Sequence, residues 1–505
     1  MKKNYRLGID IGGTFTDFAV VEQDTGAVQV EKMLTSAKAP EKTVLKGVDR
    51  LGDNISDMLT QTSEVIHATT LITNVILERK GAKTALLTTS GFRDILELAR
   101  EVRYDIFDMF IRLPEPMVPR HLRLGVTERL LADGKVLEPL DEDEVREAAR
   151  IFRNLNVEAV AVAFLHSYRD GKHEKRAAEI LREEIPGITV SLSHEVHPEP
   201  KEYERTSTTV IDAYVKGVAE GYLDRLTLGL QDRGYTSRLF VMLSNGGTAT
   251  VETAKSVPVQ IVESGPAAGV EAASYFGRLM DVNNMLSFDM GGTTAKLCII
   301  ENGRAARTRT FEVDRVHRFK AGSGLPAAVP VYDLLEIGAG GGSIARVNDL
   351  GLIQVGPDSA GSDPGPASYN LNGDLPTVTD ADLLLGYLNP DYFLGGKIKL
   401  NFENAKESFE NLGKQLSVSW LKAAWGAYDL VCENMASAAR VHVVEKGRDP
   451  RNYSMVCMGG AGPVHAVNVA KKLGISEIII PPGSGAASAI GMLVSPVSFT
   501  VTRSK

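Results

Sequence analysis

The chain alternates between short apolar runs and amphipathic stretches. Runs such as "KTALLTTS" (83–90) and "VEAVAVAFLHS" (157–167) are rich in aliphatic and β-branched residues and are typical of buried strands. The stretches 141–156 and 171–185 place apolar residues at helical spacing, and acidic residues fill the first turn of the former. This alternation predicts an α/β protein.

The same pattern suggests how the domains are arranged. A charged segment (199–226) separates the first α/β series from a strand-like run, "RLFVMLSN" (238–245), so we expect one domain over 1–200 and a second over 201–495. Residues 311–389 are rich in Gly, Pro, Asp and Ser, yet they keep apolar positions and end in the helical "TDADLLLGYL" (379–388). We interpret them as an ordered, loop-rich insertion in the second domain.

An internal repeat is the most informative feature. "LGIDIGGTFTD" (7–17) aligns without gaps on "LSFDMGGTTAK" (286–296), and each copy reads as a strand, a carboxylate, a glycine turn and hydroxyl residues. One copy alone is also typical of a plain hairpin whose glycines adopt positive φ. Two copies, one in each half of the chain, indicate a duplicated functional element.

The repeated residues suit the binding of a phosphorylated ligand. A Gly-Gly turn lets backbone amides approach phosphate oxygens, and threonine hydroxyls add donors. Asp10 and Asp289, at the strand ends, are expected to act catalytically, by binding Mg²⁺ (or Mn²⁺) directly or through water or by orienting an attacking group. The residues predicted to contact phosphate are Gly12, Gly13, Thr14, Thr16, Gly291, Gly292, Thr293 and Thr294.

The motif differs from the common nucleotide-binding turns, since the chain has no G-x-x-x-x-G-K-[ST] and neither turn shows G-x-G-x-x-G. Facing hairpins from two similar domains instead resemble the phosphate clamp of the actin, sugar kinase and Hsp70 superfamily. That resemblance implies a two-domain, actin-like ATPase architecture with ATP as the cofactor.

A third glycine motif, "MVCMGGAGPVHA" (455–466), follows an apolar run and precedes a predicted helix. In the superfamily such a turn lies against adenosine, so the resemblance implies this role for Gly459, Gly460 and Gly462. The alternative is a strand-to-helix turn that only needs small residues. The stretch 481–496 resembles the small-residue helix that crosses the interdomain hinge.

Composition and charge exclude several classes of partner. The net charge of −8 gives no reason to expect nucleic acid, and no run approaches the roughly 18 apolar residues of a membrane span. Cys298, Cys432 and Cys457 match no zinc or redox spacing and are expected to be buried, reduced thiols. These features favour a cytoplasmic protein.

With these motifs in place, the sequence resembles the hydantoinase A and 5-oxoprolinase family over nearly its whole length. The matching segments are 8–17, 67–100, 191–215, 244–250, 262–270, 287–296, 338–347, 356–369, 376–388 and 459–466. The resemblance implies ATP-dependent opening of a cyclic amide (hydantoin, 5-oxoproline or lactam type), with a hydantoinase B-like subunit as partner. Relatives in the same family serve acetone and acetophenone carboxylases.

Phosphorylation of the amide oxygen would convert a poor electrophile into an activated imidate-like phosphate. Lys296 is a candidate catalytic residue that offsets the developing charge, or else a solvated charge at a strand end. Asp17 either belongs to the site or caps its hairpin. Glu263 either lies near the nucleotide or caps a helix.

The substrate side is expected in two loops, 336–347 and 356–369, although glycine-rich loops also serve turns alone. The candidate residues of the first loop are Glu336, Gly340, Gly341, Gly342 and Ser343. Leu335 stands where the family commonly has a histidine, which argues against a histidine-dependent metal or base in this loop. His67, His166 and His194 are expected to be structural.

The leading hypothesis is therefore an ATP-hydrolysing subunit of a cyclic-amide hydrolase of the hydantoinase and oxoprolinase type. The alternatives are the ATP-using subunit of an acetone- or acetophenone-type carboxylase and, in another class, a nucleotide-gated regulatory protein. Family A subunits usually continue into a further C-terminal domain. Because the sequence ends at "VSFTVTRSK", that domain is expected to be a separate chain, removed by truncation or unnecessary in this branch.

Overall fold

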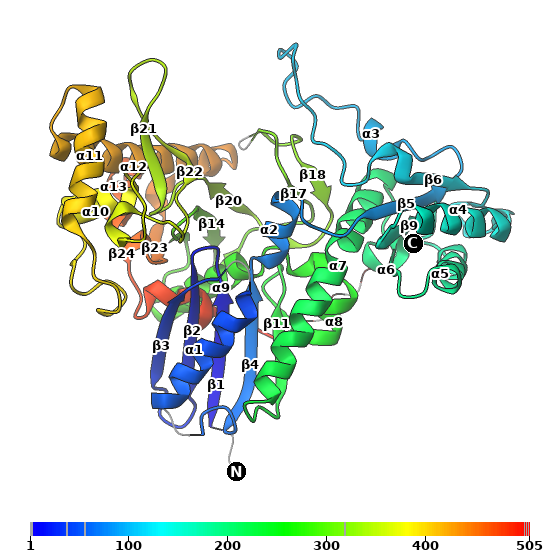
Figure 1. Cartoon of the computed structure of the whole chain (residues 1–505), viewed down its shortest axis with the longest axis horizontal. Coiled ribbons are helices and arrows are strands. Elements are labelled where there is room, and N and C mark those ends of the chain that lie inside the picture. Colours follow the sequence, from blue (N-terminus) through cyan, green and yellow to red (C-terminus); the bar gives the residue numbers. More distant parts are fainter. Residues whose placement is uncertain are drawn as a thin grey trace.

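A computed structural model describes residues 4–36, 39–54, 57–317 and 320–498, together with 500, 502 and 504. Two six-stranded sheets and one four-stranded sheet, each flanked by helices, form the body of the molecule (Figure 1). This architecture confirms the predicted α/β class. Among the described residues, no helix combines the length and the apolar character needed to cross a bilayer.

The first sheet has the strand order β12-β11-β4-β1-β2-β3. Its strands are β1 (Tyr5–Ile11), β2 (Phe15–Glu22), β3 (Val28–Leu34), β4 (Thr62–Thr69), β11 (Arg238–Met242) and β12 (Thr248–Thr250). The strands β1, β2 and β3 form an antiparallel meander, whereas β4 runs parallel to β1 and β11 runs parallel to β4. Helix α1 (Pro40–Asn54) packs against this sheet.

A second six-stranded sheet repeats this order as β14-β13-β23-β24. Its strands are β13 (Met285–Met290), β14 (Ala295–Glu301), β15 (Arg304–Ala305), β20 (Leu334–Ile337), β23 (Ser454–Met458) and β24 (Ile478–Ile479). As in the first sheet, an antiparallel hairpin is followed by two parallel neighbours. The structure thus confirms that the repeated motif belongs to a duplicated hairpin, β1–β2 and β13–β14.

The four-stranded sheet is entirely parallel, in the order β10-β9-β5-β6. Its elements are β5 (Thr84–Thr89), β6 (Arg123–Val126), β9 (Ala159–Ala163), β10 (Thr189–Leu192), α4 (Glu142–Asn154) and α5 (Lys172–Glu184). The helix predicted from residue 141 is present as α4. The Asp141 carboxylate caps its N-terminus by accepting hydrogen bonds from the amides of Asp143 and Glu144.

The charged segment near residue 200 is helical. It forms α7 (Glu202–Gln231), a long helix that packs against β9, β10 and α1 and is largely buried. Its threonines bond back to the preceding turn, as Thr208 does to the Glu204 carbonyl, which lets a polar sequence enter the core. Because β11 and β12 then join the first sheet, that lobe extends past the predicted division at residue 200.

The insertion at 311–389 is built from short paired strands and one helix. Its elements include β17 (Phe311–Val313), β18 (Leu325–Ala327), β19 (Val331–Tyr332), β20, β21 (Ser343–Val347), β22 (Ile353–Ser359) and α10 (Val378–Leu384). Helices α11 (Phe402–Leu416) and α12 (Trp420–Glu445) follow, and they pack against each other and against α10 (Figure 1). Cys298, Cys432 and Cys457 are buried free thiols, as predicted.

Two helices cross closely between the two large sheets. A Cβ on Gly491, in α14 (Ala487–Val494), would overlap the Ala268 carbonyl of α9 (Ser264–Leu279). On the other side of α14, a Cβ on Gly8 of β1 would overlap the Ala489 carbonyl. These contacts confirm that the small-residue helix packs at the junction of the two lobes.

This crossing generates a stability prediction. We expect Gly491→Ala to lower the free energy of unfolding by about 1–3 kcal/mol, because the added methyl group must displace the α9 backbone. Chemical denaturation measures the change. Gly217→Ala in α7 is the matched control, since a Cβ there meets nothing within 4 Å and alanine favours the helix. Equal stability of the two variants would contradict the close crossing.

Candidate active site

A cavity of about 460 Å³ lies where the two repeated hairpins face each other. Its volume is typical of a site for a small ligand. The residues predicted from sequence that line it are Asp10, Gly12, Gly13, Thr14, Asp289, Gly291, Gly292, Thr293, Thr294, Lys296, Gly341, Gly459 and Gly460. The structure therefore brings both hairpins and the third glycine motif to one cavity.

The turns of the two hairpins touch. The hydroxyl oxygens of Thr14 and Thr293 are 3.3 Å apart. The turns are closed in the same way, by the Gly12 amide donating to the Phe15 carbonyl and the Gly291 amide donating to the Thr294 carbonyl. A Cβ on Gly292 would lie 2.7 Å from the Thr14 hydroxyl, so glycine at this position is a condition for the approach of the turns.

The carboxylates of Asp10 and Asp289 both lie against α9. A Cβ on Gly265 would come within 2.9 Å of one Asp10 oxygen, and a Cβ on Gly269 within 3.1 Å of one Asp289 oxygen. Gly459, which has a φ of +84°, leaves room for the other Asp289 oxygen. Glycines thus surround the two acidic side chains where any larger residue would displace them.

Burial controls the electrostatics of this pair. Burial, followed by repulsion from Asp17 and Asp289, raises the pKa of Asp10 to about 7. The pKa of Asp289 is also raised, chiefly by burial. One oxygen of Asp10 is buried and has no hydrogen-bond partner among the described residues. A cation would satisfy this oxygen and the negative charge around it.

These residues fit a divalent metal ion that is shared with a ligand. Mg²⁺ is usually held by one or two carboxylates together with substrate phosphates and water. Within the described part of the chain, no group of three or more His, Cys, Asp or Glu side chains is placed to hold a metal by itself. Asp10 and Asp289 would supply the protein ligands, directly or through water.

Lys296 occupies the position in its hairpin that Asp17 occupies in the other. It pairs across the strands with Asp289, as Asp17 pairs with Asp10. Its ammonium lies 3.7 Å from a Glu263 oxygen and 3.9 Å from a Glu336 oxygen, and its side chain is 17% exposed. Burial lowers the pKa of Lys296, but the surrounding carboxylates outweigh burial and raise it overall. Lys296 is therefore not a solvated strand-end charge.

Asp17 forms an ion pair with Lys32 of β3, a residue that no sequence motif had indicated. The Lys32 ammonium also donates to the Gly485 carbonyl at 2.9 Å, and both Lys32 and Asp17 line the cavity. Asp17 therefore belongs to the site rather than acting only as a hairpin cap. Glu263 stands at the N-cap of α9 but makes no side-chain capping bond, and faces Lys296 instead.

Two predicted phosphate or adenosine contacts do not line the cavity. Thr16 is buried on the other face of β2, where its hydroxyl lies 2.9 Å from that of Thr35, which in turn donates to the Gly12 carbonyl. Gly462 begins α13 (Gly462–Leu473), and a Cβ there would lie 3.1 Å from the Cys457 sulfur. Both residues pack against the turns on the side away from the cavity.

The predicted substrate loop mainly supports the second hairpin. The amides of Gly341 and Gly342 donate to the carbonyls of Gly291 and Gly292 at 3.0 and 2.7 Å. A Cβ on Gly340 would lie 2.6 Å from the Gly292 backbone. Ser343 accepts a hydrogen bond from the Gly340 amide, and of these four residues only Gly341 lines the cavity. Their contacts are those of turn support, and a substrate role for them and for Glu336 stays a prediction.

An aromatic wall was not predicted from the sequence. It lies beside the Gly459–Gly460 turn, and its members are Tyr369, Tyr387, Leu388, Tyr392 and Phe393. All but Tyr369 come from "GYLNPDYFLGG" (386–396), where aromatic residues stand among turn-forming Gly, Asn and Pro. That local density of aromatic residues in a turn is the signal that could have identified the wall.

Asp382, also at the cavity wall, pairs with buried His465 at 3.3 Å. Burial lowers the pKa of His465, but the nearby Asp382 carboxylate and Cys432 outweigh burial and raise it to about 10.

The three histidines expected to be structural lie outside the cavity. The His67 ring contacts the Ile9 carbonyl at 3.1 Å and the Tyr222 hydroxyl at 2.7 Å, and burial lowers its pKa to about 4. His194 contacts the buried Glu174 carboxylate, and His166 contacts the Tyr168 hydroxyl. Each ring is held by local partners, as predicted.

Comparison with known proteins places this site in a family. The chain is 40% identical over 501 residues to an uncharacterized protein of Methanocaldococcus jannaschii, a match covering 98% of the chain and 73% of the relative. It is 35% identical over 505 residues to the caprolactamase subunit alpha of Pseudomonas jessenii, covering 99% and 71%. It is also 32% identical to the acetophenone carboxylase gamma subunit of Aromatoleum aromaticum, covering 99% and 69%.

Solved structures agree. A nucleotide-free acetone carboxylase superposes with a TM-score of 0.86 at 29% identity, covering 97% of this chain and 70% of that one. The ATP-dependent caprolactamase of P. jessenii superposes with a TM-score of 0.81 at 34% identity, covering 97% and 71%. Residues 6–185 match the hydantoinase/oxoprolinase N-terminal region, and residues 205–501 match the hydantoinase/oxoprolinase model. The chain belongs to the hydantoinase/oxoprolinase family.

Proposed function

We propose that this chain is the ATP-using subunit of a hydrolase that opens a cyclic amide of the hydantoin, 5-oxoproline or lactam type. The observation that carries the proposal is the contact between Thr14 and Thr293, which brings two glycine turns and two strand-end carboxylates to one cavity. A clamp of this kind fits the phosphate chain of ATP. The similarity to a caprolactamase subunit supports a lactam-type substrate.

The cavity offers a separate place for each part of ATP. The glycine turns at 12–13 and 291–292 present backbone amides to the phosphates, with the hydroxyls of Thr14, Thr293 and Thr294 beside them. The Gly459–Gly460 turn leaves space for the ribose, and the aromatic wall offers a stacking surface for the base. This distribution supports a γ-phosphate position between the two hairpins.

Asp10 and Asp289 would hold Mg²⁺ or Mn²⁺, which neutralises charge on the phosphates when it is bound. The raised pKa of Asp10 means that cation binding must displace a proton near neutral pH. Lys296, held as a cation by Glu263 and Glu336, lines the same cavity and would stabilise the charge that develops on the transferred phosphoryl group.

The proposed reaction balances as follows. The amide oxygen of the substrate attacks the γ-phosphorus, the bond from that phosphorus to the β,γ-bridging oxygen breaks, and ADP leaves. One water adds to the activated carbon, and cleavage of the C–N bond releases the ring amine and leaves an acyl phosphate. A second water releases phosphate from the acyl phosphate, so two waters are consumed for each ring opened.

A second candidate function uses the same clamp. The superposition on acetone carboxylase favours an ATP-using subunit that activates bicarbonate or an enolate. In both cases we propose a hydantoinase B-type polypeptide as partner and the cytoplasm as the compartment. The two functions can be distinguished by the substrate that stimulates ATP consumption.

The first test is a substrate screen. ADP release by the chain, with its hydantoinase B-type partner present, is measured with hydantoin, 5-oxoproline, caprolactam, and acetone plus bicarbonate. We expect at least tenfold stimulation by a cyclic amide, together with an equal amount of ring-opened product. Stimulation by ketone plus bicarbonate alone would instead establish the carboxylase function.

The second test removes the carboxylates. We expect Asp10→Asn and Asp289→Asn each to lower ATP turnover at least 100-fold, because each removes a charge needed to bind the metal ion. The exposed Asp374→Asn is the matched control and should keep normal turnover. Circular dichroism checks that the fold persists. Normal turnover in both cavity variants would refute their assigned roles.

The third test uses the pKa of Asp10. Unfolded Asp10 ionises near pH 4 and folded Asp10 near pH 7, so this carboxylate increasingly destabilises the metal-free protein as pH rises through that interval. Asp10→Asn removes this pH-dependent destabilisation. The free energy of unfolding of the variant minus that of the parent protein should therefore grow from pH 4 to pH 7, by at most about 4 kcal/mol, and then level off.

Denaturation with a chelator present, at pH values from 4 to 8, measures this difference. Asp374→Asn should follow the parent protein throughout. A difference between Asp10→Asn and the parent that is constant with pH would show that Asp10 ionises normally.

A further inference from the structure

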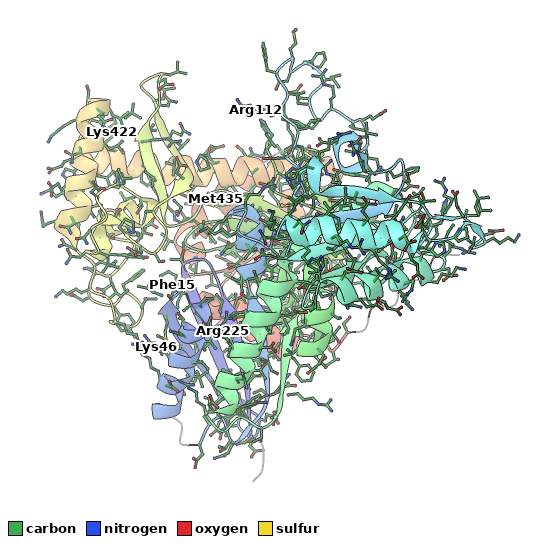
Figure 2. The ribbon with its side chains drawn as sticks, turned by 45° about the vertical axis from the view of Figure 1, so that its right-hand side comes forward. Phe15, Lys46, Arg112, Arg225, Lys422 and Met435 are labelled. Carbon is green, nitrogen blue, oxygen red and sulfur yellow. The ribbon has the colours of Figure 1, made fainter. Side chains whose placement is uncertain are left out.

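A projecting loop carries the most exposed group of large apolar side chains among the described residues. This loop, residues 101–113, which we call the arm, follows α3 (Ile95–Leu98) and extends away from the body of the molecule (Figure 1). Figure 2 labels Arg112 on it. The exposed fractions are Val102 67%, Ile106 70%, Phe107 89%, Met109 86%, Phe110 89% and Leu113 56%.

The arm is ordered by its own hydrogen bonds. The Asp105 carboxylate accepts from the Phe107 amide at 3.0 Å, and the Asp108 carboxylate accepts from the Phe110 amide at 2.8 Å. These are two consecutive Asx turns, in the repeated pattern "DIF" and "DMF". The Tyr104 hydroxyl closes the base of the arm by donating to the Arg112 carbonyl at 2.8 Å.

Two ion pairs fix the direction in which the arm points. Arg100, immediately before the arm, donates from Nε and Nη2 to the two carboxylate oxygens of Glu204 in the first turn of α7. Within the arm, Asp105 pairs with Lys320 of the insertion. The arm is therefore tied both to the core helix of the first lobe and to the insertion, so its apolar tip is presented in a fixed orientation.

A tip of this composition is stable in water only at a cost. Each phenylalanine, methionine or isoleucine left exposed forgoes the stabilisation that its burial would give, and single-chain proteins rarely gather such residues on one projection. Aromatic anchors that are already ordered bind a groove with little loss of conformational entropy. The tip has the properties of a docking element.

We propose that the arm docks into an apolar groove of a different protein subunit, the hydantoinase B-type partner. This inference rests on the proposed function, which includes that partner. Several relatives of this chain are named as subunits, which supports a partner of a different kind. The six exposed apolar side chains of the arm are fewer than the roughly 20–30 residues a side of a stable interface, so the arm anchors a wider contact.

The charges on the arm favour a protein over a lipid surface. The acidic residues of the arm, Glu101, Asp105 and Asp108, outnumber its two arginines, Arg103 and Arg112, so the arm has no net positive charge that would attract it to an anionic bilayer. A second copy of this chain is disfavoured by geometry. The apolar hollow lined by Tyr387, by Trp425 of α12 and by Val467 of α13 lies away from the arm, so a dimer formed by the arm would need both arms to reach across to the far side of the other copy (Figure 1).

The test places a photo-crosslinking amino acid, p-benzoylphenylalanine, at position 107 of the full chain, which is co-expressed with the hydantoinase B-type polypeptide of the same organism. We expect a crosslink between the two different polypeptides. We also expect Phe107→Ser combined with Phe110→Ser to weaken the complex at least tenfold in light-scattering and titration measurements. Leu350→Ser, at the 81% exposed tip between β21 and β22, is the matched control and should bind normally.

Three outcomes would overturn the arm proposal. These are a crosslink between two copies of this chain, binding of the tip to phosphatidylglycerol vesicles that the serine variant loses, and normal subunit binding by the double variant. Lactam-stimulated ADP release is measured on the same samples. If the double variant binds its partner normally and releases ADP normally, the arm proposal is refuted and the catalytic proposal stands. If lactam does not stimulate ADP release by the parent complex, the catalytic proposal is refuted.

Discussion

Both carboxylates of the site rest on one face of α9, and the rest of the site depends on this packing. Gly265 lies against Asp10 and Gly269, one turn later, lies against Asp289. The same helix is crossed by α14 at Gly491, and α14 meets β1 at Gly8. The distance between the two sheets is therefore set by contacts between backbones, which deform much less than contacts between long side chains.

The duplicated hairpins are alike in geometry but carry opposite charges at one equivalent position. Where the first hairpin has Asp17, the second has Lys296. Asp17 raises the pKa of Asp10, whereas Lys296 lowers it, so the first hairpin concentrates negative charge and the second supplies a cation. A metal-bound phosphate chain needs both, a site for the metal ion on one side and a positive charge near the transferred group on the other. One duplicated scaffold thus provides two different functions.

Sequence predicted the elements that depend on local pattern and missed those that depend on distant pairing. The hairpins, the glycine turn before α13 and helix α4 follow from neighbouring residues. The alternation of side chains along β2 could also have excluded Thr16, since Phe15 and Asp17 face the cavity. Lys32, in contrast, reaches the site only because β3 pairs with β2, and β11 joins the first sheet across more than 150 residues of intervening chain.

The two lobes contribute unequally to the proposed nucleotide site. The aromatic wall and the Gly459–Gly460 turn both belong to the second lobe, so the base and ribose need contact only that lobe. Asp10 and the Thr14 turn come from the first lobe, and the Thr14 turn meets the second lobe at the Thr293 hydroxyl. Under the proposed function, the γ-phosphate would be the part of ATP that contacts both lobes, in addition to the backbone contacts at α14 that already join them. Phosphoryl transfer would then remove one of the contacts at the Thr14–Thr293 junction, which would couple the chemical step to the relative position of the lobes.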